Sequence, residues 1–84
     1  MIFSREIRAG RALLGWNQLE LAKAASVGVA TVRRLEAAED EVRGSADALW
    51  KIQKALEAAG IEFIPEEDGK GAGVRLKQSR DRRS

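Results

Sequence analysis

Residues 17–36 read NQLELAKAASVGVATVRRLE, and this stretch carries the signals for two short helices with a tight corner between them. Asn17 is a good N-cap residue and Glu20 stands three positions later, which is the pattern of a capping box that opens a helix. The segment 26–28 is too short for a loop between independent helices, so it predicts a tight corner. A second helix then follows at about residues 29–37.

The second of these helices has two different sides. At about 100° per residue, its apolar side carries Val32 and Leu35 and packs on the rest of the fold. Ala30, Arg33 and Arg34 fall within about a quarter-turn of each other on the opposite side. The sequence therefore predicts a helix that presents two neighbouring guanidinium groups to its surroundings.

The flanking segments complete a small helical domain. Ser4 caps a first helix, and Ser45 caps a fourth helix that Gly60 follows. Beyond it the pattern alternates between apolar and polar residues, which predicts short strands at residues 61–64 and 74–77. We therefore expect a mainly α fold of four helices with a short C-terminal β-hairpin or strand pair. The expected parts are a helical domain at 1–60, a strand extension at 61–77 and a disordered basic tail at 78–84.

The 84 residues include neither cysteine nor histidine. This composition excludes disulfides, thiolate or imidazole metal sites, and enzymes that use a cysteine nucleophile or a histidine base. We expect no cofactor and no metal, and an enzyme is the weakest class because no acid, base and nucleophile converge. Charges interrupt every apolar stretch, which predicts a soluble, cytoplasmic protein.

The net charge of +2 hides an uneven distribution. Residues 1–34 carry a net charge of +4, residues 35–73 carry −6 and residues 74–84 carry +4. A cationic N-terminal part suits a polyanionic partner such as the phosphate backbone of a nucleic acid. A solvated surface of mixed charge is the alternative.

The stretch from Gln18 to Glu36 resembles the helix-turn-helix of the XRE family, which includes the Cro and phage C1-type repressors. The likeness rests on the spacing of Gln18, Ala22, Val27 in the corner and the terminal Glu36, and it covers about residues 4–59. It implies a lambda-repressor-like fold and a bacterial transcription regulator that binds double-stranded DNA. The helix that Gln18 begins would lie across the DNA backbone, and the helix that Glu36 ends would enter the major groove.

Direct base readout is expected from the helix in the major groove. The guanidinium forks of Arg33 and Arg34 match the O6/N7 edge of guanine, and each such pair discriminates by about 1–3 kcal/mol. Val29 and Ala30 offer apolar contact, for instance to a thymine methyl, and Thr31 reaches a base or a phosphate. Family members commonly have a polar residue at one or more of these early positions, and this sequence departs from that pattern. For the two arginines, the alternative is phosphate contact alone or a solvated basic face.

Phosphate contacts are expected beside the motif. Gln18 can donate from its amide, and the helix that it begins adds backbone N–H groups and a partial positive charge. Further candidates are Asn17, Arg5, Arg8 and Arg43. For each of these residues, an ordinary surface position is the alternative.

Arg11 and Glu36 match positions that form an ion pair in many members of the family. Both also lie on otherwise apolar stripes, where an unpaired charge would be costly. We therefore expect a structural pair that joins the first helix to the third. Trp16 and Trp50 are expected to anchor the core or a subunit interface rather than to bind a ligand.

One small module rarely binds specifically enough to find a site in a genome, so we expect a homodimer on an inverted-repeat operator. The expected dimer contact is the strand-bearing end, through Ile61, Phe63, Ile64, Val74 and Leu76. Alternatively, the same residues cover the helical bundle of their own chain. The alternative function is an antitoxin-type module that binds a protein partner and autoregulates its operon.

Overall fold

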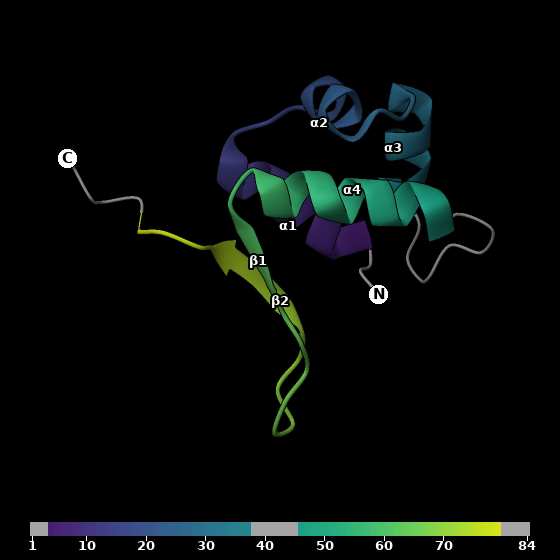
Figure 1. The fold of residues 1–84 in the computed structure, drawn as a ribbon. Helices are drawn as coiled ribbons and strands as arrows, with labels where there is room; N and C mark the ends of the chain where they lie inside the picture. Colours follow the sequence, from purple (N-terminus) through teal and green to yellow (C-terminus); the bar gives the residue numbers. More distant parts are fainter. Residues whose placement is uncertain (1–3, 38–45, 80–84) are drawn as a thin grey trace.

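The computed structural model describes residues 4–37 and 46–79, and within them it confirms the expected mainly α fold (Figure 1). The four helices are α1 (Ser4–Leu14), α2 (Gln18–Ala25), α3 (Val29–Ala37) and α4 (Ala46–Ala58). Two strands follow, β1 (Ile61–Ile64) and β2 (Gly73–Leu76). The predicted cap Ser45 and the end of the predicted tail, residues 80–84, lie outside the described residues.

A single apolar core joins the four helices to the first strand. Its members come from every helix and from the start of β1, and seven of them are almost completely inaccessible to solvent. These seven are Ile7, Leu21, Val32, Leu35, Ile52, Leu56 and Ile61. Within α4 the buried residues are Leu49, Ile52 and Leu56, which recur at the helical spacing of three and four, and this is why the sequence pattern located the helix well.

The capping box that begins α2 is present as the sequence predicted. The backbone N–H of Glu20 donates to Asn17 Oδ1 at 2.8 Å, and the backbone N–H of Asn17 donates to Glu20 Oε1 at 2.7 Å. Each side chain thus satisfies one of the backbone donors that a helix start leaves open. The start of α2 is fixed by its own sequence.

The tight corner between α2 and α3 is also present. Ser26 ends α2 in the left-handed conformation, with φ of 60°, and the backbone N–H of Val27 donates to the carbonyl of Ala22 at 3.0 Å. Half-buried Val27 packs against the core from within the turn. A corner of this kind holds α2 and α3 in one fixed relation, because both its backbone and its apolar side chain are anchored.

The two strands pair with each other within the chain as an antiparallel hairpin. Ile61 faces Leu76 and Phe63 faces Val74, and these four side chains pack toward the helices. At the far end, the backbone N–H groups of Glu67 and Lys70 donate to each other's carbonyls, and both residues between them have positive φ. This is the requirement of a two-residue type I′ turn, for which Asp-Gly is a preferred sequence.

The position of the hairpin removes Ile61 from the expected dimer contact. Ile61 has no exposed surface within the single chain, and Phe63, Val74 and Leu76 are half-buried against the core. The alternative interpretation, that these residues cover the bundle of their own chain, is the one the structure favours. Among the five residues proposed for the dimer contact, only Ile64 lies on the other side of the sheet, beside Glu62 and Arg75.

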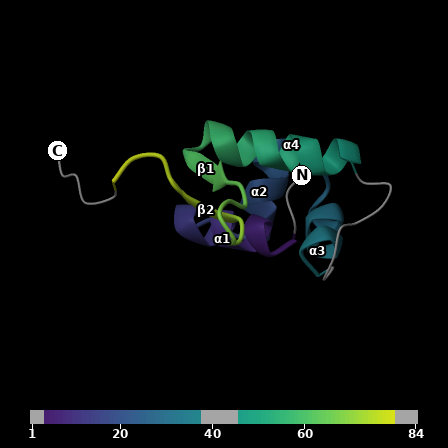
Figure 2. The same ribbon diagram turned by 90° about the horizontal axis from the view of Figure 1, so that it is seen from below.

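The hairpin and the helix-turn-helix lie on opposite sides of α4. Figure 1 shows α2 and α3 on one side of α4 and the hairpin extending away on the other. In the view from below, the hairpin points toward the viewer, and α3 lies at the right-hand end of the helical bundle (Figure 2). Within residues 4–37 and 46–79, no helix is long and apolar enough to cross a membrane.

Candidate nucleic-acid interface

The outward side of α3 is formed by arginines and alanines. Ala30, Arg33, Arg34 and Ala37 are all exposed, while Val32 and Leu35 on the opposite side are buried. The alanines on either side of the arginines add no bulk, so the helix backbone can approach a surface closely while the guanidinium groups extend toward it. This is the arrangement that the sequence predicted for Arg33 and Arg34.

The other residues expected to contact bases stand at the margins of this side. Val29 and Thr31 are half-buried, and Val29 packs against the core. Both lie in the first turn of α3, beside the exposed Ala30. The beginning of the helix thus presents mainly small and apolar surface.

A network of hydrogen bonds centred on Glu36 ties the last turn of α3 to α1 and α2. Arg11 on α1 donates to the carboxylate of Glu36 through Nε at 2.8 Å and through Nη2 at 2.9 Å. Its third nitrogen, Nη1, donates to the backbone carbonyl of Trp16 at 3.0 Å. The Glu36 side chain is only 4% exposed and that of Arg11 is 21% exposed, so a buried carboxylate meets a half-buried guanidinium group in the expected ion pair.

Gln18 joins the same network, which the sequence did not suggest. Its Nε2 donates to Glu36 Oε1 at 3.0 Å, and the side chain is half-buried. An amide nitrogen carries two hydrogens, so one of them serves Glu36 and one remains for another acceptor. Gln18 was expected to contact phosphate, and the structure places it where it also ties α2 to α3.

The ionisation of Glu36 reflects these contacts. Burial alone would raise its pKa, but the hydrogen bonds from Arg11 and Gln18, together with the positive charges of Arg11 and Arg8, outweigh burial and hold the pKa below the ordinary glutamate value. The carboxylate is therefore charged at neutral pH. The same contact raises the pKa of Arg11.

Arg8, which was expected to contact phosphate, also makes a contact within the chain. It is exposed, but its Nη1 donates to the backbone carbonyl of Glu36 in the last turn of α3. A cation at a helix C-terminus satisfies an open carbonyl and interacts favourably with the helix dipole. The signal in the sequence was that Arg8 precedes Arg11 by three residues, so both side chains leave the same side of α1.

The remaining phosphate candidates are distributed around the motif. Asn17 is exposed at the start of α2, where its side-chain oxygen is used in the capping box. Arg5 is exposed in the first turn of α1. Arg43 lies outside the described residues.

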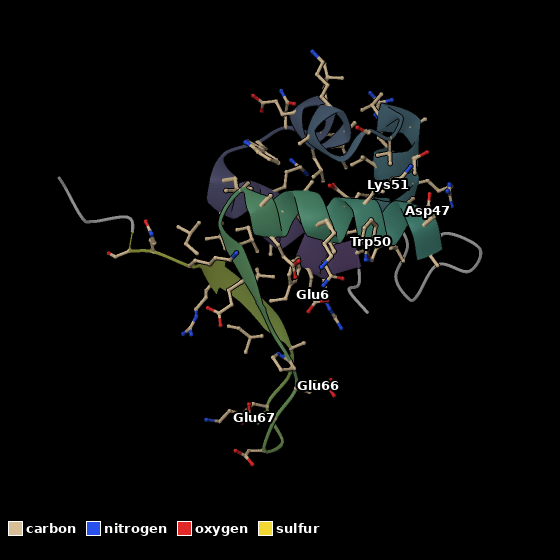
Figure 3. The ribbon with its side chains drawn as sticks, viewed as in Figure 1. Glu6, Asp47, Trp50, Lys51, Glu66 and Glu67 are labelled. Carbon is tan, nitrogen blue, oxygen red and sulfur yellow. The ribbon has the colours of Figure 1, made fainter. Side chains whose placement is uncertain are left out.

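Acidic side chains of the hairpin lie away from the outward side of α3. Glu66 and Glu67 are on the hairpin's distal part, on the side of α4 opposite to α2 and α3 (Figure 3). Phosphate groups that approach α3 would therefore not meet these carboxylates.

The two tryptophans have different environments. Trp16 is half-buried and packs against the core, as expected. Trp50 is not a core residue, because it is 59% exposed on the outward side of α4. Its spacing from Leu49 and Ile52 explains the difference, since a residue next to a buried one on a helix is turned by about 100°.

The comparisons agree with this architecture. A helix-turn-helix family model, that of the XRE type, matches residues 7–62, which is two thirds of the chain. A comparison with curated proteins gave no match. The matched region contains α1 from residue 7 onward and all of α2, α3 and α4, together with the Arg11–Glu36 pair and the outward side of α3. The chain therefore belongs to the XRE family of helix-turn-helix proteins, a family of DNA-binding regulators.

Proposed function

We propose that this protein is a sequence-specific transcription regulator that binds an inverted-repeat operator as a homodimer. In this proposal α3 enters the major groove, and Arg33 and Arg34 contact base edges there. Ala30 lies against the groove floor, Val29 and Thr31 flank it, and α2 crosses the adjacent backbone. The protein acts in the cytoplasm and needs no cofactor for binding.

The observation that carries the proposal is the pair of exposed arginines, Arg33 and Arg34, on a helix whose C-terminal turn is fixed by hydrogen bonds to α1 and α2. A side chain that discriminates between bases must be positioned to a fraction of an ångström, which demands a fixed backbone. α3 is fixed by Glu36, whose carboxylate and carbonyl are bound by Arg11, Gln18 and Arg8. Two guanidinium groups on such a helix are suited to the paired acceptors of guanine.

The start of α2 supports a backbone contact beside α3. The capping box uses the N–H groups of Asn17 and Glu20, while the N–H groups of Gln18 and Leu19 have no acceptor within the helix. The helix dipole adds a partial positive charge at this point. The remaining amide hydrogen of Gln18 has a phosphate as its natural acceptor.

Selection from a random pool of duplex DNA tests the proposal. The full chain should enrich an inverted repeat whose half-sites are about one helical turn apart, or a multiple of this. Affinity for the selected site should fall steeply with salt, because bound phosphates release counterions. Enrichment of no sequence, with equal affinity for all duplexes, would reduce the protein to a non-specific DNA binder.

A further inference from the structure

The side of α4 that faces away from the core carries one large aromatic residue among charges. Asp47, Trp50, Lys51 and Lys54 follow the spacing i, i+3, i+4 and i+7, which places them on one stripe of the helix. This stripe, here named the α4 outer face, lies opposite the side through which α4 enters the core. Figure 3 shows Asp47, Trp50 and Lys51 together along α4.

Trp50 is the reason to regard this face as a contact surface. Its side chain is 59% exposed, and within the described residues only Leu19, at 50%, is another large apolar side chain exposed to this degree. Lys54 lies over the indole with its Nζ 5.8 Å from the ring centre. Tryptophan is enriched among the residues that dominate binding energy at interfaces, because its large flat surface is dehydrated on contact.

The charges of the α4 outer face make it complementary to itself. Asp47 stands toward the N-terminal end of the face and Lys54 toward its C-terminal end. If two copies of α4 pack antiparallel about a centre between Trp50 and Lys51, Asp47 comes opposite Lys54 of the partner subunit. In the same register the indole of Trp50 comes opposite Lys51 of the partner subunit, a cation–π arrangement.

Existing contacts do not prevent this pairing. Lys51 Nζ lies 3.4 Å from Asp47 Oδ2, and Lys54 Nζ lies 3.4 Å from Glu57 Oε1. Ion pairs as exposed as these contribute little to stability, so exchanging them for contacts across an interface costs little. We infer that the α4 outer face binds the same face of a second copy of this chain, antiparallel, with Trp50 at its centre.

This inference rests on the proposed function, and its geometry agrees with it. α2 and α3 lie on one side of α4 and the hairpin on the other (Figure 1). In the antiparallel pair, the two-fold axis is perpendicular to α4 and points from the hairpin side to the side of α2 and α3. This axis keeps α2 and α3 of both copies on the same side of the dimer. A two-fold protein on an inverted repeat requires that placement.

The size of the face sets the strength of the dimer. One side of the 13-residue α4 is about 20 Å long and about 10 Å wide, which is well below the roughly 800 Å² per partner of a standard interface. The dimer is therefore weak and reversible in solution. Two half-sites on one DNA duplex would hold the copies together and raise their effective concentration.

Cysteine cross-linking of the full chain tests the register, because the natural sequence contains no cysteine. The double variant Asp47→Cys/Lys54→Cys should form disulfide-linked dimers under mild oxidation, since each introduced thiol faces the other one in the partner. Within one helix these positions are about 10 Å apart, too far for a bridge inside the chain. Each single variant should cross-link at least about tenfold less, because identical positions are about 10 Å apart along the antiparallel pair. Absence of cross-linked dimer in the double variant would overturn the inference.

Substitution of the aromatic residue gives the second measurement. Trp50→Ala should weaken dimerisation by about tenfold or more in sedimentation equilibrium, as expected for an interface anchor. Leu19→Ala removes the other exposed apolar side chain and is the matched control, which should leave dimerisation unchanged. Equal dimerisation of the Trp50→Ala variant and the unaltered protein would contradict the inference.

Binding to a single half-site separates this inference from the proposed function. Trp50→Ala should retain the half-site affinity of the unaltered protein and lose about tenfold or more on the complete inverted repeat. If the unaltered protein binds no specific DNA, the proposed function fails, whatever the cross-linking result. If specific binding persists and Trp50→Ala has no effect on the complete repeat, only the α4 interface fails.

Discussion

Arg11 and Glu36 face each other through two parallel hydrogen bonds, Nε to Oε2 at 2.8 Å and Nη2 to Oε1 at 2.9 Å. This bidentate pair links α1 to the end of α3 across 25 positions of sequence. Gln18 and the carbonyl of Trp16 complete the network, so that α1, α2 and α3 all meet at one buried carboxylate. The pair therefore connects the stability of the domain to the orientation of the helix proposed to enter DNA.

Replacement of one member should destabilise the whole domain. Arg11→Ala leaves the carboxylate of Glu36 buried without its main partner, and breaking a buried pair in this way costs about 3–5 kcal/mol. Urea denaturation would measure the loss in unfolding free energy. Arg5→Ala, at an exposed position on the same helix, is the control and should change stability by less than about 0.5 kcal/mol.

A double variant Arg11→Ala/Glu36→Ala should cost clearly less unfolding free energy than the sum of the two single variants, because the two side chains are coupled. Additive costs would mean that the pair contributes no interaction energy.

Stability should decrease in acid because of the same carboxylate. The pKa of Glu36 is lowered in the folded chain, so the unfolded chain takes up a proton at higher pH than the folded chain does. The stabilisation is fully present above the ordinary glutamate pKa of 4.5 and is lost as the pH falls through the lowered value. Denaturant titrations across this range should show the fall. Glu36→Gln should flatten it, leaving a smaller slope from Glu57, whose pKa is also lowered, first by its hydrogen bond from Gln53. An unchanged slope in the Glu36→Gln variant would show that other groups govern the acid response.

The corner of the helix-turn-helix offers a stabilising substitution. Ser26 has φ of 60°, a left-handed conformation that costs a residue with a side chain about 1–2 kcal/mol. Ser26→Gly should therefore raise the unfolding free energy by up to about 1 kcal/mol, since part of the gain is offset by the greater freedom of glycine in the unfolded chain. The opposite change, Gly15→Ala at φ of 71°, should lower stability although no atom stands within 4 Å of the added methyl group. Thermal unfolding of both variants would check that Ser26→Gly raises stability and Gly15→Ala lowers it. A destabilised Ser26→Gly variant would show that the serine side chain has a role of its own.

Much of the fold could be predicted because local patterns and tertiary contacts agree in this chain. The capping box of Asn17 and Glu20 lies within four residues, so the sequence alone determines it. The apolar spacing of α4 and the alternation of the strands were equally local signals. Ser26 is the exception within the corner, since a serine in place of glycine gives no indication of a left-handed residue.

The interior contacts and surfaces were harder to predict because they depend on distant residues. Ile61 is as apolar as an interface residue, and only the docking of the hairpin on α1 and α4 shows that it belongs to the core. A surface arginine such as Arg8 is a residue type suited to contact phosphate, yet the nearby end of α3 gives it a carbonyl to bind. Trp50 was expected to anchor the core or a subunit interface, and its 59% exposed side chain leaves only the interface.

Arg8 gives a test that separates a structural role from a phosphate contact. If its bond to the carbonyl of Glu36 is its main role, Arg8→Ala should lower stability by about 1 kcal/mol and leave the salt dependence of DNA binding nearly unchanged. Loss of a phosphate contact would instead reduce the slope of log affinity against log salt by about one. Binding titrations at several salt concentrations would measure this slope. The second result would restore Arg8 to the set of phosphate contacts.

The strongest prediction for specificity concerns the outward side of α3. Arg34→Ala should weaken binding to the selected operator by about 1–3 kcal/mol and affect non-specific duplex much less, because a bidentate contact to guanine is lost. Arg34→Lys keeps the charge but not the planar fork, so it should recover non-specific binding while leaving most of the loss at the operator. The same pair of variants at Arg33 would show whether both arginines read bases or only one. Competition binding with operator and scrambled duplex at one salt concentration would measure both affinities. If an alanine variant weakens the two to the same extent, that guanidinium group contacts phosphate alone, and recognition must then come from the first turn of α3 or from the shape of the DNA.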